Sequence, residues 1–152
     1  MIEQVIATWQ THNRINLYLL DAIAEDHLAD IAASKGRTVG EQLAHIHNVR
    51  LMWLKASAPQ LLTGLDKLEK GALLTKANIA AALEGSSKAI EDLLTEGFVK
   101  GRIKGVKPYP MTFLGYIISH ESHHRGQIMM TLKQSGHPVD KKIQFGLWEW
   151  GV

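Results

Sequence analysis

The sequence predicts an all-α protein, and two observations lead to a four-helix bundle. Four long stretches carry apolar residues every three or four positions, and no stretch alternates apolar and polar residues as a half-buried strand would. Amphipathic helices must bury their apolar faces against one another, which favours a bundle. We expect residues 1–152 to form a single domain, because the length of 152 residues is ordinary for one domain.

The first two helices are predicted over residues 2–27 and 38–57. The first stretch lacks Gly and Pro and has apolar residues on helical spacing, namely Val5, Trp9, Leu17, Leu20 and Ile23. The second begins with a capping box, in which Thr38 accepts from the backbone of Glu41 and Glu41 reaches back. Pro59 prevents much continuation beyond Ser57.

The third helix is predicted over residues 76–96 and ends near Gly97. The fourth follows Pro110, with Thr112 as its cap, and ends at Gly136, the usual stop signal before a proline. The long connections between the second and third and between the third and fourth helices leave room for a crossover. We expect the tail, residues 139–152, to pack on the bundle with Trp148 and Trp150 as core or lid residues. Three methionines are expected to fill the core, namely Met52, Met129 and Met130.

Composition excludes several classes of protein. The formal charge is only +2, and the basic stretch of Lys100, Arg102, Lys104 and Lys107 is expected to be a solvated loop, so nucleic-acid binding is not expected. Cysteine is absent, which excludes disulfides, thiolate ligands and a cysteine nucleophile. The sequence has no run of eighteen apolar residues, so a membrane span is not expected. The first residues do not resemble a signal peptide, so a cytoplasmic location is expected.

Five of the eight histidines lie in two clusters, His45/His47 and His120/His123/His124. His120 and His124 are four residues apart, so they lie about 40° from each other on one helix face and can reach one metal ion. His123 points about 60° or more away, toward the polar side. The pair predicts a metal site, although two histidines at this spacing can also be ordinary boundary residues.

A third ligand would have to come from another helix. His45 and His47 point about 160° apart, so one site cannot readily use both. The apolar stripe of that helix lies between them, so the periodicity does not decide which of the two is the third ligand. His12 on the first helix is a further possibility, as a ligand or, with Arg14, as a contact for an anionic substrate.

Other side chains of the fourth helix are candidates for supporting roles. Glu121 and Arg125 are four apart and predict an inward ion pair; alternatively, Glu121 orients a ligand imidazole or acts as an acid or base. Gln127 lies near the face of His120 and is expected to line the pocket or bond a ligand. Tyr116, one turn before His120, offers a hydroxyl or packs in the core.

Three segments resemble the DinB/YfiT-like superfamily of metal-dependent proteins. The segment 38–46 is similar to the family's second-helix start with its ligand histidine. The segment 120–127, which reads His-Glu-Ser-His-His-Arg-Gly-Gln, looks like the motif of its fourth helix, and residues 147–151 resemble its ending. Residues 9–14 also fit the first helix, so the resemblance spans nearly the whole chain.

The resemblance implies a site and a fold. Carried over residue by residue, the family's metal ligands fall on His45, His120 and His124, and this favours His45 over His47. The implied fold is a four-helix bundle with a long crossover, and the implied assembly is a homodimer. Known activities of the superfamily include thiol transfer with bacillithiol or mycothiol and a thiol-dependent isomerisation.

Together these features predict a metal-dependent enzyme for a small-molecule substrate, with zinc or nickel as the expected ion. Three neutral imidazoles leave coordination positions free, as in catalytic zinc sites. Such an ion can bind a thiol as its thiolate, and without cysteine the thiol would be a low-molecular-weight cofactor. The alternatives are a metal-dependent hydrolase and a non-catalytic metal-binding stress-response protein. An open pocket favours an enzyme, and a pocket that suits anions favours a charged thiol.

Overall fold

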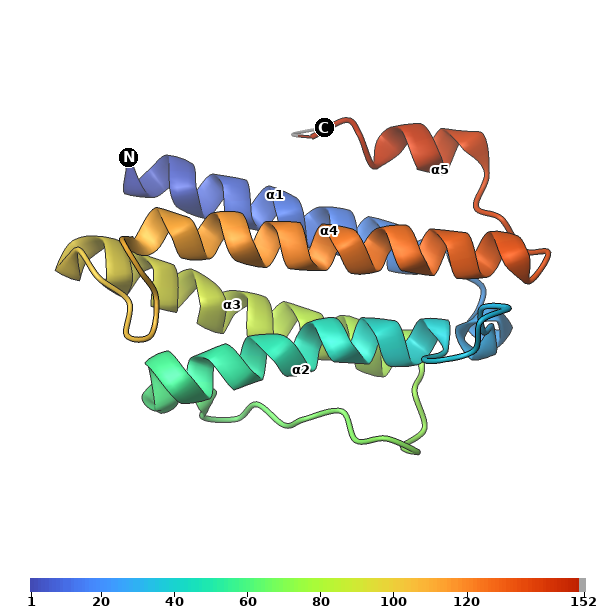
Figure 1. Ribbon diagram of the computed structural model, residues 1–152, viewed down its shortest axis with the longest axis horizontal. Helices are drawn as coiled ribbons and strands as arrows, with labels where there is room; N and C mark the ends of the chain where they lie inside the picture. The colour runs from blue at the N-terminus through green and yellow to red at the C-terminus, as the bar shows by residue number, and fades with distance from the viewer. Residues whose placement is uncertain (151–152) are drawn as a thin grey trace.

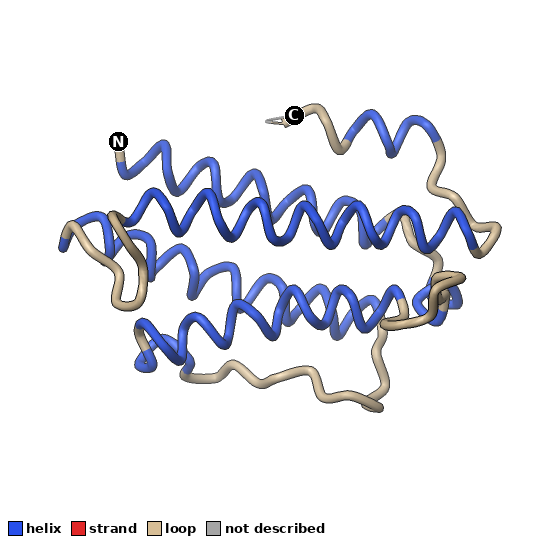
Figure 2. Tube along the Cα trace, viewed as in Figure 1, coloured by secondary structure: helices blue, strands red, loops and turns tan. Residues whose placement is uncertain are grey.

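The computed structural model describes residues 1–150 and confirms the predicted four-helix bundle (Figure 1). The long helices are α1 (Ile2–Asp21), α2 (Val39–Ser57), α3 (Lys76–Lys100) and α4 (Pro110–Gln134), and a short α5 (Lys141–Gly146) follows them. Two 3-10 turns, η1 (Glu25–Ala29) and η2 (Pro59–Leu62), lie in the connections. Helices and loops make up the described part of the chain, without a strand (Figure 2).

The crossover lies between α2 and α3. Figure 1 shows that α2 and α3 run in the same direction, opposite to α1 and α4, so the segment after η2 returns along the length of α2. The connection from α3 to α4 simply turns the chain at one end of the bundle. Each of α1 and α2 packs against both α3 and α4. This order places α2 beside α4, the two helices that carry the histidine clusters.

Three predicted helix boundaries were wrong. Helix α1 ends at Asp21, because Ala24 adopts an extended conformation and the chain continues as η1. Helix α3 continues to Lys100 and ends at Gly101, which has a positive φ of 70°. Gly97 instead permits a close approach, since a Cβ there would collide with the side chain of Ile103. Helix α4 starts with Pro110 at its first position, not with a cap at Thr112.

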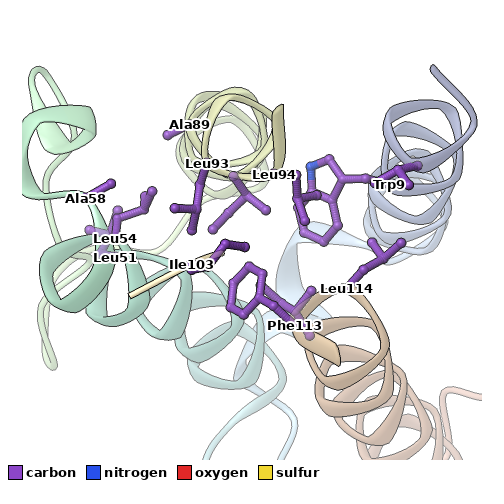
Figure 3. Close-up of a cluster of buried hydrophobic side chains, with 13 residues drawn as sticks. Trp9, Leu51, Leu54, Ala58, Ala89, Leu93, Leu94, Ile103, Phe113 and Leu114 are labelled. Atoms are coloured by element: carbon purple, nitrogen blue, oxygen red, sulfur yellow. The ribbon is translucent and has the colours of Figure 1, made fainter. Parts of the chain in front are cut away.

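The core has two apolar clusters separated by a polar layer. Figure 3 shows the first, where residues of all four helices meet, including Trp9, Leu54, Leu94 and Phe113. The second lies toward the other end of the bundle and includes Leu19, Leu43, Ile79 and Ile128. Between these positions, each helix contributes buried polar side chains, listed here in chain order: His12, Asn13, Asn16, Arg50, Ser86, Glu121 and Arg125. The helices therefore enclose a polar layer at mid-height.

The C-terminal segment contacts the bundle through only part of its apolar surface. Ile143 and Leu147 pack against the second cluster, whereas Phe145 is 66% exposed and Trp148 is 82% exposed. Of the two alternatives for Trp148, a core or a lid residue, the core alternative was wrong, because its side chain faces solvent. The ring of Trp150 lies 6.2 Å from that of His12 but is itself exposed.

The expectation for the methionines was right for only one of three. Met129 packs against the second cluster, whereas Met52 and Met130 are each 55% exposed, because they lie on the outward faces of their helices. The basic residues after α3 lie in an exposed turn, as expected. Over residues 1–150, none of the helices combines the length and the apolar character that crossing a membrane requires.

Candidate metal centre

Three histidines from two antiparallel helices meet on the α2–α4 side of the bundle. His45 comes from α2, and His120 and His124 come from consecutive turns of α4. One ring nitrogen of each lies within 4.8 Å of one nitrogen of each of the others. The ring centroids are 4.6 Å apart for His45 and His124, 4.6 Å for His120 and His124, and 5.6 Å for His45 and His120. The structure thus brings together the three predicted ligands.

The donor set fits a divalent transition-metal ion. The Nε2 atoms of His120 and His124 are 3.2 Å apart. Two nitrogens bound tetrahedrally to one zinc ion at about 2.0–2.1 Å would lie roughly 3.4 Å apart, so this pair needs little adjustment. The three rings are tilted by 56–73° to one another, which lets their nitrogen lone pairs point toward a common centre.

Gln42 fixes the orientation of one of these rings. Its Oε1 atom lies 2.8 Å from Nδ1 of His124. An amide oxygen can only accept, so Nδ1 of His124 carries the hydrogen and Nε2 keeps its lone pair for a metal. Sequence reasoning missed Gln42, although it precedes His45 by three residues and therefore shares its helix face.

All three histidines are held in the neutral form that binds metals. Burial lowers the pKa of His124 to about 4, and repulsion from His120 and His45 adds to this effect. Burial also lowers the pKa of His45 and of His120, and the Arg37 guanidinium contributes at His45. At neutral pH the three rings therefore present lone pairs that no proton occupies.

Glu121 faces the polar layer and not the three histidines. Its side chain is fully buried, and both carboxylate oxygens accept from the Arg50 guanidinium, at 2.7 Å from Nε and 2.8 Å from Nη2. His12 and Asn16 each lie 2.8 Å from the same Oε2 atom. Burial alone would raise the pKa of Glu121, but the charge and hydrogen bonds of Arg50 outweigh it and hold that pKa far below its usual value. Glu121 is thus a buried anion that anchors α4 to α1 and α2.

The predicted ion pair between Glu121 and Arg125 does not form. Arg125 instead donates to Oδ1 of Asn16 at 2.6 Å and to the hydroxyl of Ser122 at 2.9 Å. The fully buried Arg50 takes its place because it reaches Glu121 from the facing helix α2. A sequence signal existed, since Arg50 continues the apolar stripe of Leu43 and Ile46, where a charge requires a buried partner.

The remaining histidines have different surroundings. His12 is buried in the polar layer beside Glu121, far from solvent, and burial lowers its pKa. His47 is also buried, and its Nε2 donates to the carbonyl oxygen of Asp66 at 2.8 Å, so it holds the crossover segment. His123 is exposed on the polar side of α4, as its helix position predicts.

Tyr116 and Gln127 border the three histidines from α4. The ring of Tyr116 stacks on that of His120 at a centroid distance of 6.0 Å and also contacts Trp53. Tyr116 is 42% exposed, so the core-packing alternative was wrong for it. Gln127 is exposed. Hydrogen bonding by its side chain raises the pKa of His124 and so offsets part of the effect of burial. Both residues can therefore meet a molecule that approaches the site from solvent.

A cavity of about 640 Å³ opens beside the histidine cluster, between α2 and the crossover. His45 lines it, together with three cationic side chains, Arg37, Lys67 and Lys70. Two carboxylates, Glu41 and Glu69, also contribute, so the charged lining has an excess of one positive charge, three against two. Sequence reasoning did not find this cavity, because its wall is built by a segment without regular structure.

The crossover forms the cavity wall because hydrogen bonds hold it against α2. The side chain of Asn48 donates to the carbonyl oxygen of Leu68 and accepts from its backbone nitrogen, both at 2.9 Å. Such a pair mimics the pairing between two strands and satisfies a loop backbone that has no helix of its own. Together with His47, Asn48 keeps residues 66–68 against α2.

Comparison with known proteins agrees with this architecture. The DinB family model matches residues 1–143. A DinB-like protein from Bacillus subtilis has a similar structure, with a TM-score of 0.62 and 20% identity over 88% of this chain and 93% of that one. A DinB-like protein from Bacillus cereus has a TM-score of 0.64 and 20% identity over 91% of this chain and 95% of that one. No curated protein matched. With the family model covering nearly its whole length, this chain belongs to the DinB family.

Proposed function

We propose that the chain binds one divalent metal ion through His45, His120 and His124 and uses it to activate a low-molecular-weight thiol for transfer to an electrophile. The observation that carries the proposal is that His45 belongs both to the histidine cluster and to the lining of the cavity. A molecule bound in the cavity would therefore lie beside the ion. Zinc and nickel suit the all-imidazole donor set.

When bound, a divalent ion with three imidazole ligands supplies an open position that binds a thiol as its thiolate at neutral pH. The residues of the chain do the rest. Gln42 keeps Nε2 of His124 directed at the ion, and the buried ion pair of Glu121 with Arg50 holds α4 in register with α2. Tyr116 and Gln127 flank the approach from solvent.

The charge of the cavity supports a thiol that carries an anionic group. Arg37 and Lys70 can pair with a carboxylate on such a thiol, since ionic hydrogen bonds are the stronger kind, whereas Lys67 already lies 3.7 Å from Glu69. A neutral ester or amide would gain nothing from the excess of one positive charge in this lining. This favours the transferase over a metal-dependent hydrolase, and an open cavity beside the histidines favours both over a binding protein without catalysis.

The test combines metal content with a thiol panel. Protein purified without a histidine tag should carry about one ion per chain at the site of His45, His120 and His124, and His124→Ala should remove the ion from this site whereas His123→Ala should not. Metal-loaded protein would then be assayed with an aromatic chloride as the electrophile and with thiols that do or do not carry a carboxylate. Transfer that needs the metal and prefers the carboxylate thiols is expected. Ester hydrolysis without thiol transfer would favour the hydrolase.

We also propose that the chain acts as a homodimer. Several large apolar side chains remain exposed, among them Met52, Met111 and Tyr109, and a second copy could cover them. Light scattering coupled to size-exclusion chromatography should give twice the mass of one chain. A mass of 16.9 kDa would rule out the dimer.

A further inference from the structure

We propose a second metal-binding site, formed by His27, Asp30 and His137 at the end of the bundle where α4 finishes. Each of the three residues offers one ligand atom, and these atoms all lie within 4.8 Å of one another. Two imidazoles and one carboxylate form a ligand set that suits zinc, nickel, cobalt or copper. This inference concerns different residues from the proposed function and does not depend on it.

The site is far from the first histidine cluster. Gln134, the last residue of α4, is ten residues beyond His124, which corresponds to about 15 Å along the helix. His137 lies further on, after the helix has ended. No residue is shared between the two clusters, so each can be removed by substitution while the other is kept.

The backbone around these residues is fixed before any ion binds. The amide nitrogen of His137 donates to the carbonyl oxygen of Leu132 at 2.8 Å, and Gly136 has a φ of 82°, which together form a Schellman end of α4. On the other side, the backbone N–H of Asp30 donates to the carbonyl oxygen of His27, and the carbonyl oxygen of Asp30 accepts from the backbone N–H of Val39. Both ends of the cluster are thus held in place by local hydrogen bonds.

The side chains already face one another. The rings of His27 and His137 stack with centroids 3.6 Å apart and planes inclined by 6°. Oδ2 of Asp30 lies 2.7 Å from Nδ1 of His137. That nitrogen donates to the carboxylate, so Nε2 of His137 keeps its lone pair in the neutral ring.

The charge of the cluster favours a cation. Within the described residues, His137 is the only partner that forms an ion pair with Asp30, and no Lys or Arg neutralises this carboxylate. With neutral imidazoles the cluster carries one negative charge. A carboxylate that is only 11% exposed and lacks a permanent cationic partner provides a favourable place for a divalent ion.

Coordination requires one ring to turn. A metal lies in the plane of each imidazole that binds it, whereas two stacked rings direct their lone pairs side by side. The side chain of His137 is 39% exposed, so it has room to rotate about its Cβ–Cγ bond without disturbing the core. The ion would then link η1 to the turn before α5, two segments more than 100 residues apart, and stabilise the folded chain by mass action.

The test counts zinc equivalents by calorimetric titration of tag-free protein. The wild-type chain should bind about two ions, and a variant with His27→Gln and His137→Gln should bind about one. A His123→Gln variant, which alters an exposed histidine outside both clusters, should match the wild type. In a His45→Ala, His120→Ala, His124→Ala background, zinc should still raise the melting temperature, and adding His137→Gln should abolish that rise.

Equal stoichiometry of the wild type and the His27→Gln, His137→Gln variant would overturn the second site. If the three-alanine background fails to fold, the comparison of wild type with the double-glutamine variant still decides the matter. Loss of the second equivalent alone supports the second site. Retention of all zinc in the three-alanine background would instead count against the first site, so the two failures are distinguishable.

Discussion

The Oε1 atom of Gln42 lies 2.8 Å from Nδ1 of His124, so a residue of α2 sets the tautomer of a ring on α4. Both side chains are largely buried, which leaves the hydrogen bond little competition from water. The same helix supplies His45, so α2 contributes one candidate ligand and the support of another. Helix α2 therefore affects two of the three candidate ligands, His45 directly and His124 through Gln42.

Replacement of Gln42 by Leu should weaken metal binding by about 10- to 100-fold, because His124 loses the acceptor that fixes its ring. Competition with a chelator of known affinity would measure the change. Gln60→Leu, at an exposed glutamine of η2, is the matched control and should leave the affinity unchanged. An unchanged affinity in the Gln42 variant would show that this hydrogen bond does not support a metal ligand.

Arg50→Met should destabilise the fold by about 3–5 kcal/mol, because it leaves the buried carboxylate of Glu121 without its main partner. The additional change Glu121→Leu should restore much of this loss, since neither member of the Arg50–Glu121 pair is then left without its partner. Urea unfolding of the single and double variants measures both effects. A double variant less stable than Arg50→Met alone would contradict the idea that the charges compensate each other.

Much of the site could be predicted where it depends on one helix. The pair His120 and His124 follows from helical spacing alone, because residues four apart share a face. The choice of His45 over His47 could not, since both flank the apolar stripe and only the packing of α2 on α4 decides. Family resemblance supplied that choice, and the structure brings His45 to the α4 pair.

The errors have a common physical cause. Glu121 and Arg125 have the spacing of an intrahelical ion pair, but a buried carboxylate prefers a guanidinium that reaches both of its oxygens, and Arg50 on another helix does so. Trp148 was expected to be a core or lid residue, and the core alternative was wrong. A short C-terminal helix has only one face to bury, and here Ile143 occupies it. Contacts between helices, which no single periodicity contains, decide these cases.

The stability of the metal-free protein should fall as the pH drops from about 6.5 toward 4. Five histidines have lowered pKa values in the fold, and burial is the largest cause for each: His12, His45, His47, His120 and His124. Below pH 6.5 the unfolded chain binds protons at these residues that the folded chain does not, so protonation favours unfolding. For His124 the effect continues until its folded pKa, about 4, is reached.

Urea unfolding in the presence of a chelator, repeated at several pH values, would measure this slope. A His124→Asn variant should show a weaker dependence on pH, because one of the five groups is removed, whereas His123→Asn serves as the control. Stability that is constant or increases between pH 6.5 and 4 would contradict the burial of these histidines in their neutral form.

Asn48→Ala should release the crossover from α2 and expose it to protease. The substitution removes two hydrogen bonds to the backbone of Leu68, worth together about 1–3 kcal/mol. Since 1.4 kcal/mol corresponds to a factor of ten, trypsin should cut after Lys67 or Lys70 roughly five times faster or more. Mass spectrometry of the early fragments identifies the site of cleavage.

The matched control is Asn78→Ala, at an exposed asparagine near the start of α3 whose backbone nitrogen is held by Thr75 and does not need the side chain. Metal content should stay the same in both variants, because neither residue belongs to the histidine cluster. A faster cut in the Asn48 variant alone would connect the wall of the cavity to this one side chain. Equal cleavage rates in the two variants would mean that His47 suffices to hold the crossover against α2.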